Sequence, residues 1–335
     1  MGERSDWMSG HYGIMIHYLP PDIYDCNGNK IEDPQEAVNS FDVPAFMKQF
    51  DECGAEWLIF TIGQNTGFYS APNDVIEKRA GSGHCAVRDL VMELADQVAL
   101  RGKKLIAYLP TEVASNSSMK EPFGWVDEAD AVQTEFWKRY LDVVRFWGER
   151  YGKKVAGWWF DGCYAPLPWQ EWSDAAKCGN EERVIAFNDG CFLVDQLMPV
   201  WDKCDYFAGE GPRIAPDGTV YLGRGPQALQ TYRNQGKYMP GTRVLAHILT
   251  NLDELWFFAP NPSLDWLNEW FPGHTYNTGA SRTIRKPIYS DEQLRQLLHD
   301  FCGNGGAVTF NLGCYVNGQM SADSVAQLAR LKSER

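Results

Sequence analysis

The residue with the clearest chemical potential is Asp161, which ends the run Trp-Trp-Phe-Asp-Gly at positions 158–162. Three aromatic residues precede the carboxyl group and a glycine follows it, which predicts a buried strand that turns at its end. A buried carboxylate needs a hydrogen-bonding partner or a chemical task. We therefore interpret Asp161 as a functional residue, and the alternative is that it only caps the loop that follows.

Hydrolysis of a glycosidic bond is one such task, and it needs two carboxyl groups flanking the bond. They lie about 5–5.5 Å apart in enzymes that retain the anomeric configuration and about 6.5–9.5 Å apart in those that invert it. Glu210, which stands between two glycines after a short apolar segment, is the first candidate for the second group. Glu112, after a Leu-Pro-Thr segment, is the alternative, and Glu254 and Glu269 are weaker candidates. Each glutamate could instead be a solvated loop residue.

Other side chains near the ends of predicted strands are suited to bind a sugar. His17 ends the first strand, where its imidazole could bond a hydroxyl group, although a histidine in an apolar strand is more often a satisfied core residue. Aromatic residues make up 13% of the chain, and an aromatic ring packs on the apolar face of a sugar as readily as in a core. The predicted substrate-binding residues are His17, Gln64, Asn65, Trp159 and Asn188.

The elements that must position these residues alternate along the chain. Short apolar runs predict strands at 13–18, 57–62, 104–109, 155–160, 184–187, 205–208, 244–249 and 307–312. Helical spacing of apolar residues predicts helices from Asp42 to Gly54, from Val87 to Gly102, from Phe136 to near Gly152, and through Leu331. Strands that alternate with helices predict a parallel sheet.

The polar strand ends favour a closed barrel over an open sheet. In a barrel the carboxyl ends of all strands meet at one mouth, so His17, Glu112, Asp161, Asn188 and Glu210 would converge there. An open dinucleotide-binding sheet would carry Gly-x-Gly-x-x-Gly after its first strand, and the sequence lacks that motif. We therefore expect one α/β domain over residues 1–335, a (β/α)8 TIM-like barrel.

Charge and hydropathy exclude other classes of protein. The formal net charge is −13, which argues against nucleic-acid binding, because clustered Lys and Arg supply most of that affinity. No apolar run reaches the ~18 residues that a membrane-spanning helix needs. The first residues lack the apolar stretch of a secretory signal. The predicted location is the cytoplasm, or outside the cell if a signal peptide has been removed.

Metal and cofactor motifs are missing from the sequence. The nine cysteines form no Cys-x-x-Cys pair and no Cys/His cluster with zinc spacing. An acidic segment at 25–36 resembles a calcium loop, but Lys30 stands where the sharp turn of that loop needs glycine. We predict no metal and no cofactor, and the sequence predicts no oligomeric state.

Four segments resemble, in the same order, motifs of the α-L-fucosidases of glycoside hydrolase family 29. Residues 12–18, Tyr-Gly-Ile-Met-Ile-His-Tyr, are similar to Phe-Gly-Ile-Phe-Ile-His-Trp in the first strand of that family. Residues 54–61 resemble the second strand, 159–162 the nucleophile strand, and 304–306 with 311–313 the closing segment. The resemblance implies a barrel and a double displacement, with Asp161 as the nucleophile and His17 in contact with the sugar.

The sequence also departs from that family. Residues 63–68 are Gly-Gln-Asn-Thr-Gly-Phe where the family has Lys-His-His-Asp-Gly-Phe. Gln64 and Asn65 can form hydrogen bonds but carry no titratable proton, so the terminal sugar need not be L-fucose. The acid/base glutamate varies in position across the family, so Glu210 and Glu112 rest on their placement alone. The chain ends soon after its last strand, so we expect the usual C-terminal β-sandwich to be absent.

The predicted function is that of a retaining, exo-acting glycoside hydrolase whose partner is an oligosaccharide or glycoconjugate substrate, with no nucleic acid and no membrane. The alternative is a non-catalytic carbohydrate-binding barrel, because the histidine pair is replaced and the acid/base is unassigned. A third hypothesis is a metal-dependent hydrolase that uses the acids at the strand ends.

Overall fold

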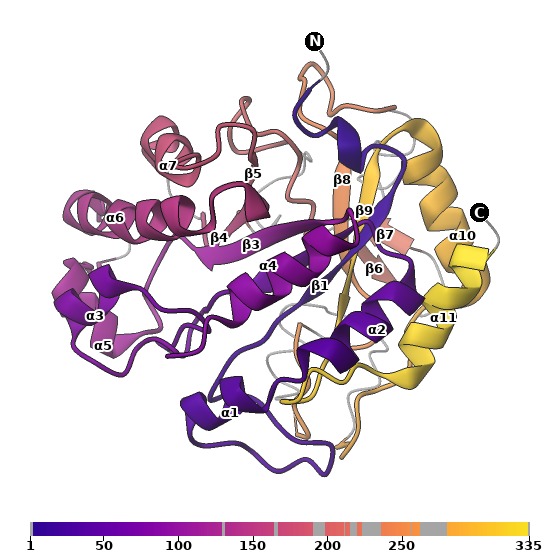
Figure 1. Cartoon of the computed structure of the whole chain (residues 1–335). Helices are drawn as coiled ribbons and strands as arrows, with labels where there is room; N and C mark the ends of the chain where they lie inside the picture. The colour runs from indigo at the N-terminus through magenta and orange to yellow at the C-terminus, as the bar shows by residue number, and fades with distance from the viewer. Residues whose placement is uncertain are drawn as a thin grey trace.

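The apolar runs of the sequence form the parallel strands of one curled sheet (Figure 1). The computed structural model describes residues 3–128, 131–163, 167–189, 198–210, 212–214, 220–222, 236–254, 256–261 and 280–333. The strands of the sheet are β1 (Tyr12–Ile16), β2 (Trp57–Thr61), β3 (Lys104–Pro110), β4 (Val155–Asp161), β5 (Val184–Phe187), β8 (His247–Asn251) and β9 (Ala307–Leu312). Their order is β5-β4-β3-β2-β1-β9-β8, so the first and last strands along the chain are neighbours.

The two edges of this sheet, β5 and β8, are both hydrogen-bonded to the extended segment 205–210. The backbone N–H of Asp205 donates to the carbonyl of Ile185 (2.9 Å), and the N–H of Phe207 donates to that of Leu245 (2.9 Å). Farther along, the N–H of Leu249 donates to the carbonyl of Gly209 (2.7 Å). The sheet therefore curls into an α/β barrel-like fold. The short antiparallel strands β6 (Pro212–Ile214) and β7 (Val220–Leu222) follow this segment.

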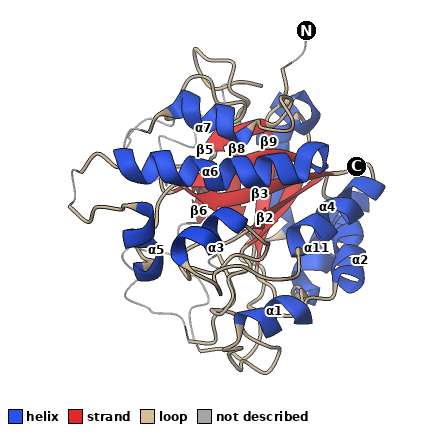
Figure 2. Cartoon of the chain, turned by 60° about the vertical axis from the view of Figure 1, so that its left-hand side comes forward, coloured by secondary structure: helices blue, strands red, loops and turns tan. Residues whose placement is uncertain are grey.

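Helices cover the outer face of the strands, as the two views show together (Figures 1 and 2). The described helices are α1 (Pro34–Ser40), α2 (Val43–Cys53), α3 (Asp74–Ala80), α4 (Leu90–Leu100), α5 (Ser117–Phe123), α6 (Thr134–Tyr151), α7 (Trp169–Ala176), α10 (Asp291–Phe301) and α11 (Ala322–Ser333), with the 3-10 turns η1 (Asp6–Met8), η2 (Gly152–Lys154) and η3 (Cys302–Asn304). None of the described helices is both long and apolar enough to span a bilayer.

Local signals fix most helix boundaries close to their predicted places. Asp42 caps α2 by accepting the N–H of Ala45, and Gly54 ends the helix in the left-handed conformation. The helix predicted from Val87 begins later, at Leu90, because the side chain of Asp89 caps it by accepting the N–H of Met92. Val87 itself is 89% exposed and belongs to the preceding loop.

The apolar side chains form two layers. One lies between the strands and the helices, and it contains the inward faces of α2, α4 and α6. The other fills the inside of the curled sheet and includes Trp57, Ile106, Tyr108 and Trp159. Tyr108 and Trp159 stack with ring centroids 5.2 Å apart. Because both are near the carboxyl ends of neighbouring strands, this inner layer forms the base on which the candidate site is built.

Candidate active site

A cavity of about 590 Å³ opens at the carboxyl ends of the strands. Seven of the eight predicted site residues line it: His17, Gln64, Asn65, Glu112, Trp159, Asp161 and Glu210. Asn188, the eighth, is fully buried and is not part of the lining. Further walls come from the loop that carries Trp125 and Gln133, and from Trp256 and Phe257.

Asp161 is the last residue of β4, and three side chains donate hydrogen bonds to its carboxylate. The hydroxyl of Tyr108 (2.5 Å) and the amide of Gln64 (3.1 Å) donate to Oδ2. The amide of Asn188 donates to Oδ1 (2.8 Å). The donors come from the ends of three other strands, so the carboxylate is held in one orientation in the cavity wall.

Glu210 reaches the same cavity because of the glycine that precedes it. Gly209 has a φ of 67°, and a Cβ on it would lie 2.1 Å from the carbonyl oxygen of His247, so only glycine permits this close approach to β8. The side-chain nitrogen of Asn188, which donates to Asp161, also donates to Oε2 of Glu210. Since one nitrogen bonds both oxygens, Oδ1 of Asp161 and Oε2 of Glu210 are at most ~6 Å apart.

The environment of Glu210 favours its protonated form. Burial is the main cause that raises the pKa of Glu210 well above that of an ordinary glutamate, and the negative charges of Asp161 and Asp189 add to it. The hydrogen bond from Asn188 lowers the pKa but does not cancel these causes. The site therefore contains two close carboxyl groups of which one is biased toward the neutral acid.

Glu112 also lies beside the nucleophile candidate. Its Oε2 accepts the backbone N–H of Ala114, and burial raises the pKa of Glu112, with a smaller contribution from the charge of Asp161. Gly162 has a φ of 70°, and a Cβ there would lie 2.8 Å from Cγ of Glu112. The glutamate thus packs directly against the residue that follows Asp161.

His17 presents an acceptor nitrogen to the cavity. Nδ1 of His17 lies 2.8 Å from Oδ1 of Asn311, and the amide nitrogen of Asn311 donates to the carbonyl of Trp256 (2.9 Å). That second bond sets the orientation of the Asn311 amide, so Nδ1 of His17 is the donor and Nε2 is left unprotonated. Burial lowers the pKa of His17 to about 4, so the ring is neutral near pH 7 and can accept a hydrogen bond from a hydroxyl group.

Two aromatic residues of the site were not predicted from the sequence. Tyr108 lies in a predicted strand, but no local signal indicates that its hydroxyl bonds Asp161. Trp256 packs 5.4 Å from the ring of His17, and it has a φ of 70°, which is unfavourable for a residue other than glycine. Such strain has no sequence signature, so only the structure reveals it.

The weaker acid candidates do not join this group. Glu254 forms a buried ion pair with Arg285 (2.6 Å) and does not line the cavity. Glu269 lies outside the described residues. Within the described parts of the chain, no three His, Cys, Asp or Glu side chains are grouped so that they could hold a metal ion.

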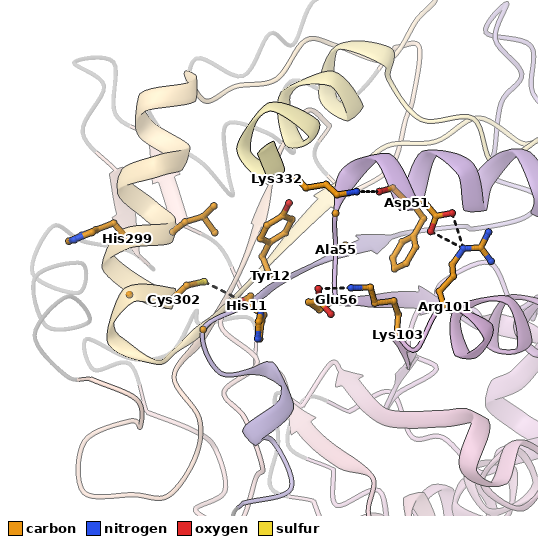
Figure 3. Close-up of a pocket in the computed structure, with 15 residues that line it drawn as sticks. His11, Tyr12, Asp51, Ala55, Glu56, Arg101, Lys103, His299, Cys302 and Lys332 are labelled. Atoms are coloured by element: carbon orange, nitrogen blue, oxygen red, sulfur yellow. Dashed lines mark hydrogen bonds and ion pairs between the residues drawn. The ribbon is translucent and has the colours of Figure 1, made fainter. Parts of the chain in front are cut away.

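A second cavity, of about 1000 Å³, lies at the amino ends of the strands, next to the starts of β1, β2 and β3 (Figure 3). Its two acidic side chains each form an ion pair with a basic side chain of the same cavity. Lys103 bonds Glu56 (2.5 Å), and Arg101 bonds Asp51 (2.8 Å). This cavity is larger than the first, yet its acids are each neutralised by a cation.

Comparisons with known proteins show similarity of fold. No protein-family model matches the sequence, and no curated protein sequence matches it significantly. Among solved structures, the endo-fucoidan hydrolase P5AFcnA of glycoside hydrolase family 107 superposes with a TM-score of 0.65 at 16% identity, over 99% of this chain and 93% of that chain. Another endo-fucoidan hydrolase of family 107, MfFcnA4, gives a TM-score of 0.69 at 14% identity, over 99% of this chain and 53% of that one.

The α-L-fucosidases are similar in the same way. Alpha-L-fucosidase isoenzyme 1 from Paenibacillus thiaminolyticus gives a TM-score of 0.61 at 15% identity, over 99% of this chain and 75% of that chain. The fold of this protein is therefore that of fucosidase-like glycoside hydrolases.

Proposed function

We propose that this protein is a retaining exo-glycoside hydrolase of α-L-fucosidase-like type, which removes a terminal sugar from an oligosaccharide or glycoconjugate. The observation that carries the proposal is the single amide nitrogen of Asn188 that bonds both Asp161 and Glu210. It limits the two bonded oxygens to a separation of ~6 Å at most. That limit suits the pair of a retaining enzyme, at about 5–5.5 Å, better than that of an inverting one, at about 6.5–9.5 Å.

In the first displacement, Asp161 is the nucleophile and Glu210 is the acid. A carboxylate oxygen of Asp161 bonds to the anomeric carbon while the bond from that carbon to the leaving oxygen breaks. The proton of Glu210 passes to the leaving oxygen, so the aglycone departs as a neutral alcohol. The raised pKa of Glu210 supports this role, because it favours the protonated form that a general acid needs.

In the second displacement, Glu210 acts as the base. It takes a proton from water as the water oxygen bonds to the anomeric carbon, and the ester bond to Asp161 breaks. The charge of Asp161 is one cause of the raised pKa of Glu210. Because the ester intermediate carries no such charge, the pKa of Glu210 falls at the step that needs it as a base. Glu112, whose pKa is also raised, is the alternative acid/base.

The other lining residues are proposed to bind the sugar. Nε2 of His17 would accept a hydrogen bond from a hydroxyl group, and the face of Trp159 would pack on the C–H face of the ring. The amide nitrogen of Gln64 donates a hydrogen bond to Asp161 (3.1 Å). Gln64 would therefore help to orient the nucleophile as well as line the sugar pocket. Asn65 lies on the cavity rim. Since these two amides replace a histidine pair, we propose that the substrate is not restricted to L-fucose.

We also propose that the fold is a complete (β/α)8 barrel in one domain. The hydrogen bonds of segment 205–210 to both β5 and β8 support it, because they place an eighth extended segment between the two sheet edges. Glu210 then ends that segment as Asp161 ends β4, and both acids face one mouth.

Substitution of Asp161 tests the function. We expect Asp161→Gly to lower turnover of the best substrate in a panel of 4-nitrophenyl glycosides by a factor on the order of 10⁴–10⁶. Azide should restore turnover and yield a glycosyl azide, because the small anion fits the space left by the carboxylate. Asp51→Gly, at the opposite end of the sheet, is the matched control and should keep full activity. A fully active Asp161→Gly protein would refute the proposal.

A non-catalytic sugar-binding barrel is the second candidate, favoured by Gln64 and Asn65 in place of two histidines. In that case the wild-type protein would be stabilised against heat by a sugar but would hydrolyse no glycoside at any pH. The same glycoside panel, read by absorbance and by thermal shift, separates the two functions.

A further inference from the structure

Asn188 is anchored on both sides of the nucleophile candidate. It directly follows β5 and is fully buried. Its backbone N–H donates to the carbonyl of Phe160 (2.8 Å), and its own carbonyl accepts the N–H of Cys163 (2.8 Å). Phe160 and Cys163 flank Asp161 in the sequence. These two backbone hydrogen bonds therefore hold Asn188 beside Asp161 independently of its side-chain contacts.

The side chain of Asn188 is directed at the two acids. Its Nδ2 donates to Oδ1 of Asp161 (2.8 Å) and to Oε2 of Glu210. The amide nitrogen has two hydrogens, and these two bonds use both. Asn188 is fully buried and is absent from the residues that line the cavity.

We propose that Asn188 is a positioning residue that holds the nucleophile Asp161 and the acid/base Glu210 at a fixed separation by donating one amide hydrogen to each. The inference rests on the proposed function and deepens it. A bond from Asn188 to Oε2 of Glu210 also leaves the carboxylic proton to the other oxygen, Oε1, because Oε2 acts as an acceptor.

The arrangement suits a reaction in which charge moves from one acid to the other. Before the first displacement Asp161 carries the negative charge and Glu210 the proton. Afterwards Asp161 is an ester and Glu210 is a carboxylate. Through both states the amide of Asn188 faces one negative charge, so it need not reorient as the bond to the sugar forms. Donors that are already in place where charge develops are an efficient means of stabilising a transition state.

The inference is tested with Asn188→Ala and the nearly isosteric Asn188→Asp. We expect Asn188→Ala to lower kcat for the best aryl glycoside by about 10²-fold, as loss of one preorganised donor does elsewhere. KM and the thermal shift with the free sugar should change less than two-fold, because the residue is buried and does not line the cavity. The fall of kcat/KM at alkaline pH should move to higher pH in both variants, since the bond from Asn188 lowers the pKa of Glu210.

Asn73→Ala is the matched control. Asn73 is similarly buried, at 1% exposure, and it caps α3 and does not line the cavity, so its loss should lower stability without moving the pH profile. If Asn188→Ala fails to fold, Asn188→Asp decides, because it keeps the shape and replaces the amide, which donates one hydrogen to each acid, with a carboxyl group that cannot donate to both. Unchanged kcat and pH profile, a rise in KM alone, or failure of both Asn188 variants to fold while Asn73→Ala folds would each overturn the inference. A wild-type protein that hydrolyses no glycoside would instead reject the proposed function.

Discussion

The two ends of the sheet hold cavities of opposite character. At the amino ends, Asp51 and Glu56 are paired with Arg101 and Lys103 in a cavity of about 1000 Å³ (Figure 3). At the carboxyl ends, the smaller cavity brings together Glu112, Asp161 and Glu210, which are hydrogen-bonded by neutral amide and hydroxyl groups.

Size is therefore a poor guide to the active site of this protein. Close carboxyl groups repel each other, and burial adds to the cost of their charges. In this group burial, with a smaller contribution from the charge of Asp161, raises the pKa of Glu210 and of Glu112. Buried carboxyl groups with raised pKa values are typical of catalytic sites. The smaller cavity is therefore the candidate active site.

After the aspartates, the next largest difference in activity between the two ends should appear when a glutamate at each is changed to glutamine. Glu210→Gln should lower kcat/KM for a phenyl glycoside by about 10²–10⁴-fold, because the leaving oxygen loses its proton donor. For a 2,4-dinitrophenyl glycoside, whose leaving group needs no proton, the loss should be small. Glu56→Gln at the amino ends is the control and should change neither rate by more than two-fold.

Equal losses for both leaving groups would contradict the assignment of Glu210 as the acid. The same pair of substrates then tests Glu112→Gln, because Glu112 is the alternative at the same cavity. If Glu56→Gln lowered kcat/KM as much as Glu210→Gln, the catalytic role could not be assigned to the cavity at the carboxyl ends.

The pH dependence should show the raised pKa of the acid. Glu210 acts in its protonated form, so kcat/KM should fall as the pH rises through its pKa. Burial and the charge of Asp161 raise that pKa, so the fall should begin well above the ordinary value of about 4.3 for glutamate. With the 2,4-dinitrophenyl glycoside, the fall should be absent in Glu210→Gln. Its persistence there would assign the titration to another group.

The smallest effect concerns stability at the amino ends. The side chains of Glu56 and Lys103 are 36% and 29% exposed, and exposed ion pairs contribute little. Glu56→Gln should therefore lower the free energy of unfolding in urea by less than about 1 kcal/mol, and added salt should reduce the difference. A loss that salt does not reduce would mean that this pair is not a screened surface interaction.

From local features the sequence predicted an α/β barrel-like fold and a strand that ends in Asp161. The strand that ends in Asp161 is marked by its aromatic run, and the cap of Asp42 and the turn at Gly54 mark the ends of α2. The resemblance to the α-L-fucosidases agrees with the fold of the solved structures that match. The eighth strand of the predicted barrel remains a proposal, supported by the hydrogen bonds of segment 205–210.

Other features of the site depend on contacts that no single segment contains. The sequence predicted Asn188 as a substrate-binding residue, and that role remains a prediction. Its two bonds to the acids follow from the spacing of β4, β5 and segment 205–210. The sequence also made Glu254 a weaker candidate acid. In the structure Glu254 pairs with Arg285, which lies 31 residues farther along the chain.

Hydropathy and capping act over a few residues, so the sequence alone determined most of the segments that become strands and which acid ends the aromatic one. Register between strands and the direction of each side chain result from packing of the whole chain, because a strand shifted by one residue turns every side chain to the other face. Only the tertiary structure could therefore decide which donors hold Asp161, which glutamate shares Asn188 with it, and which cavity contains them.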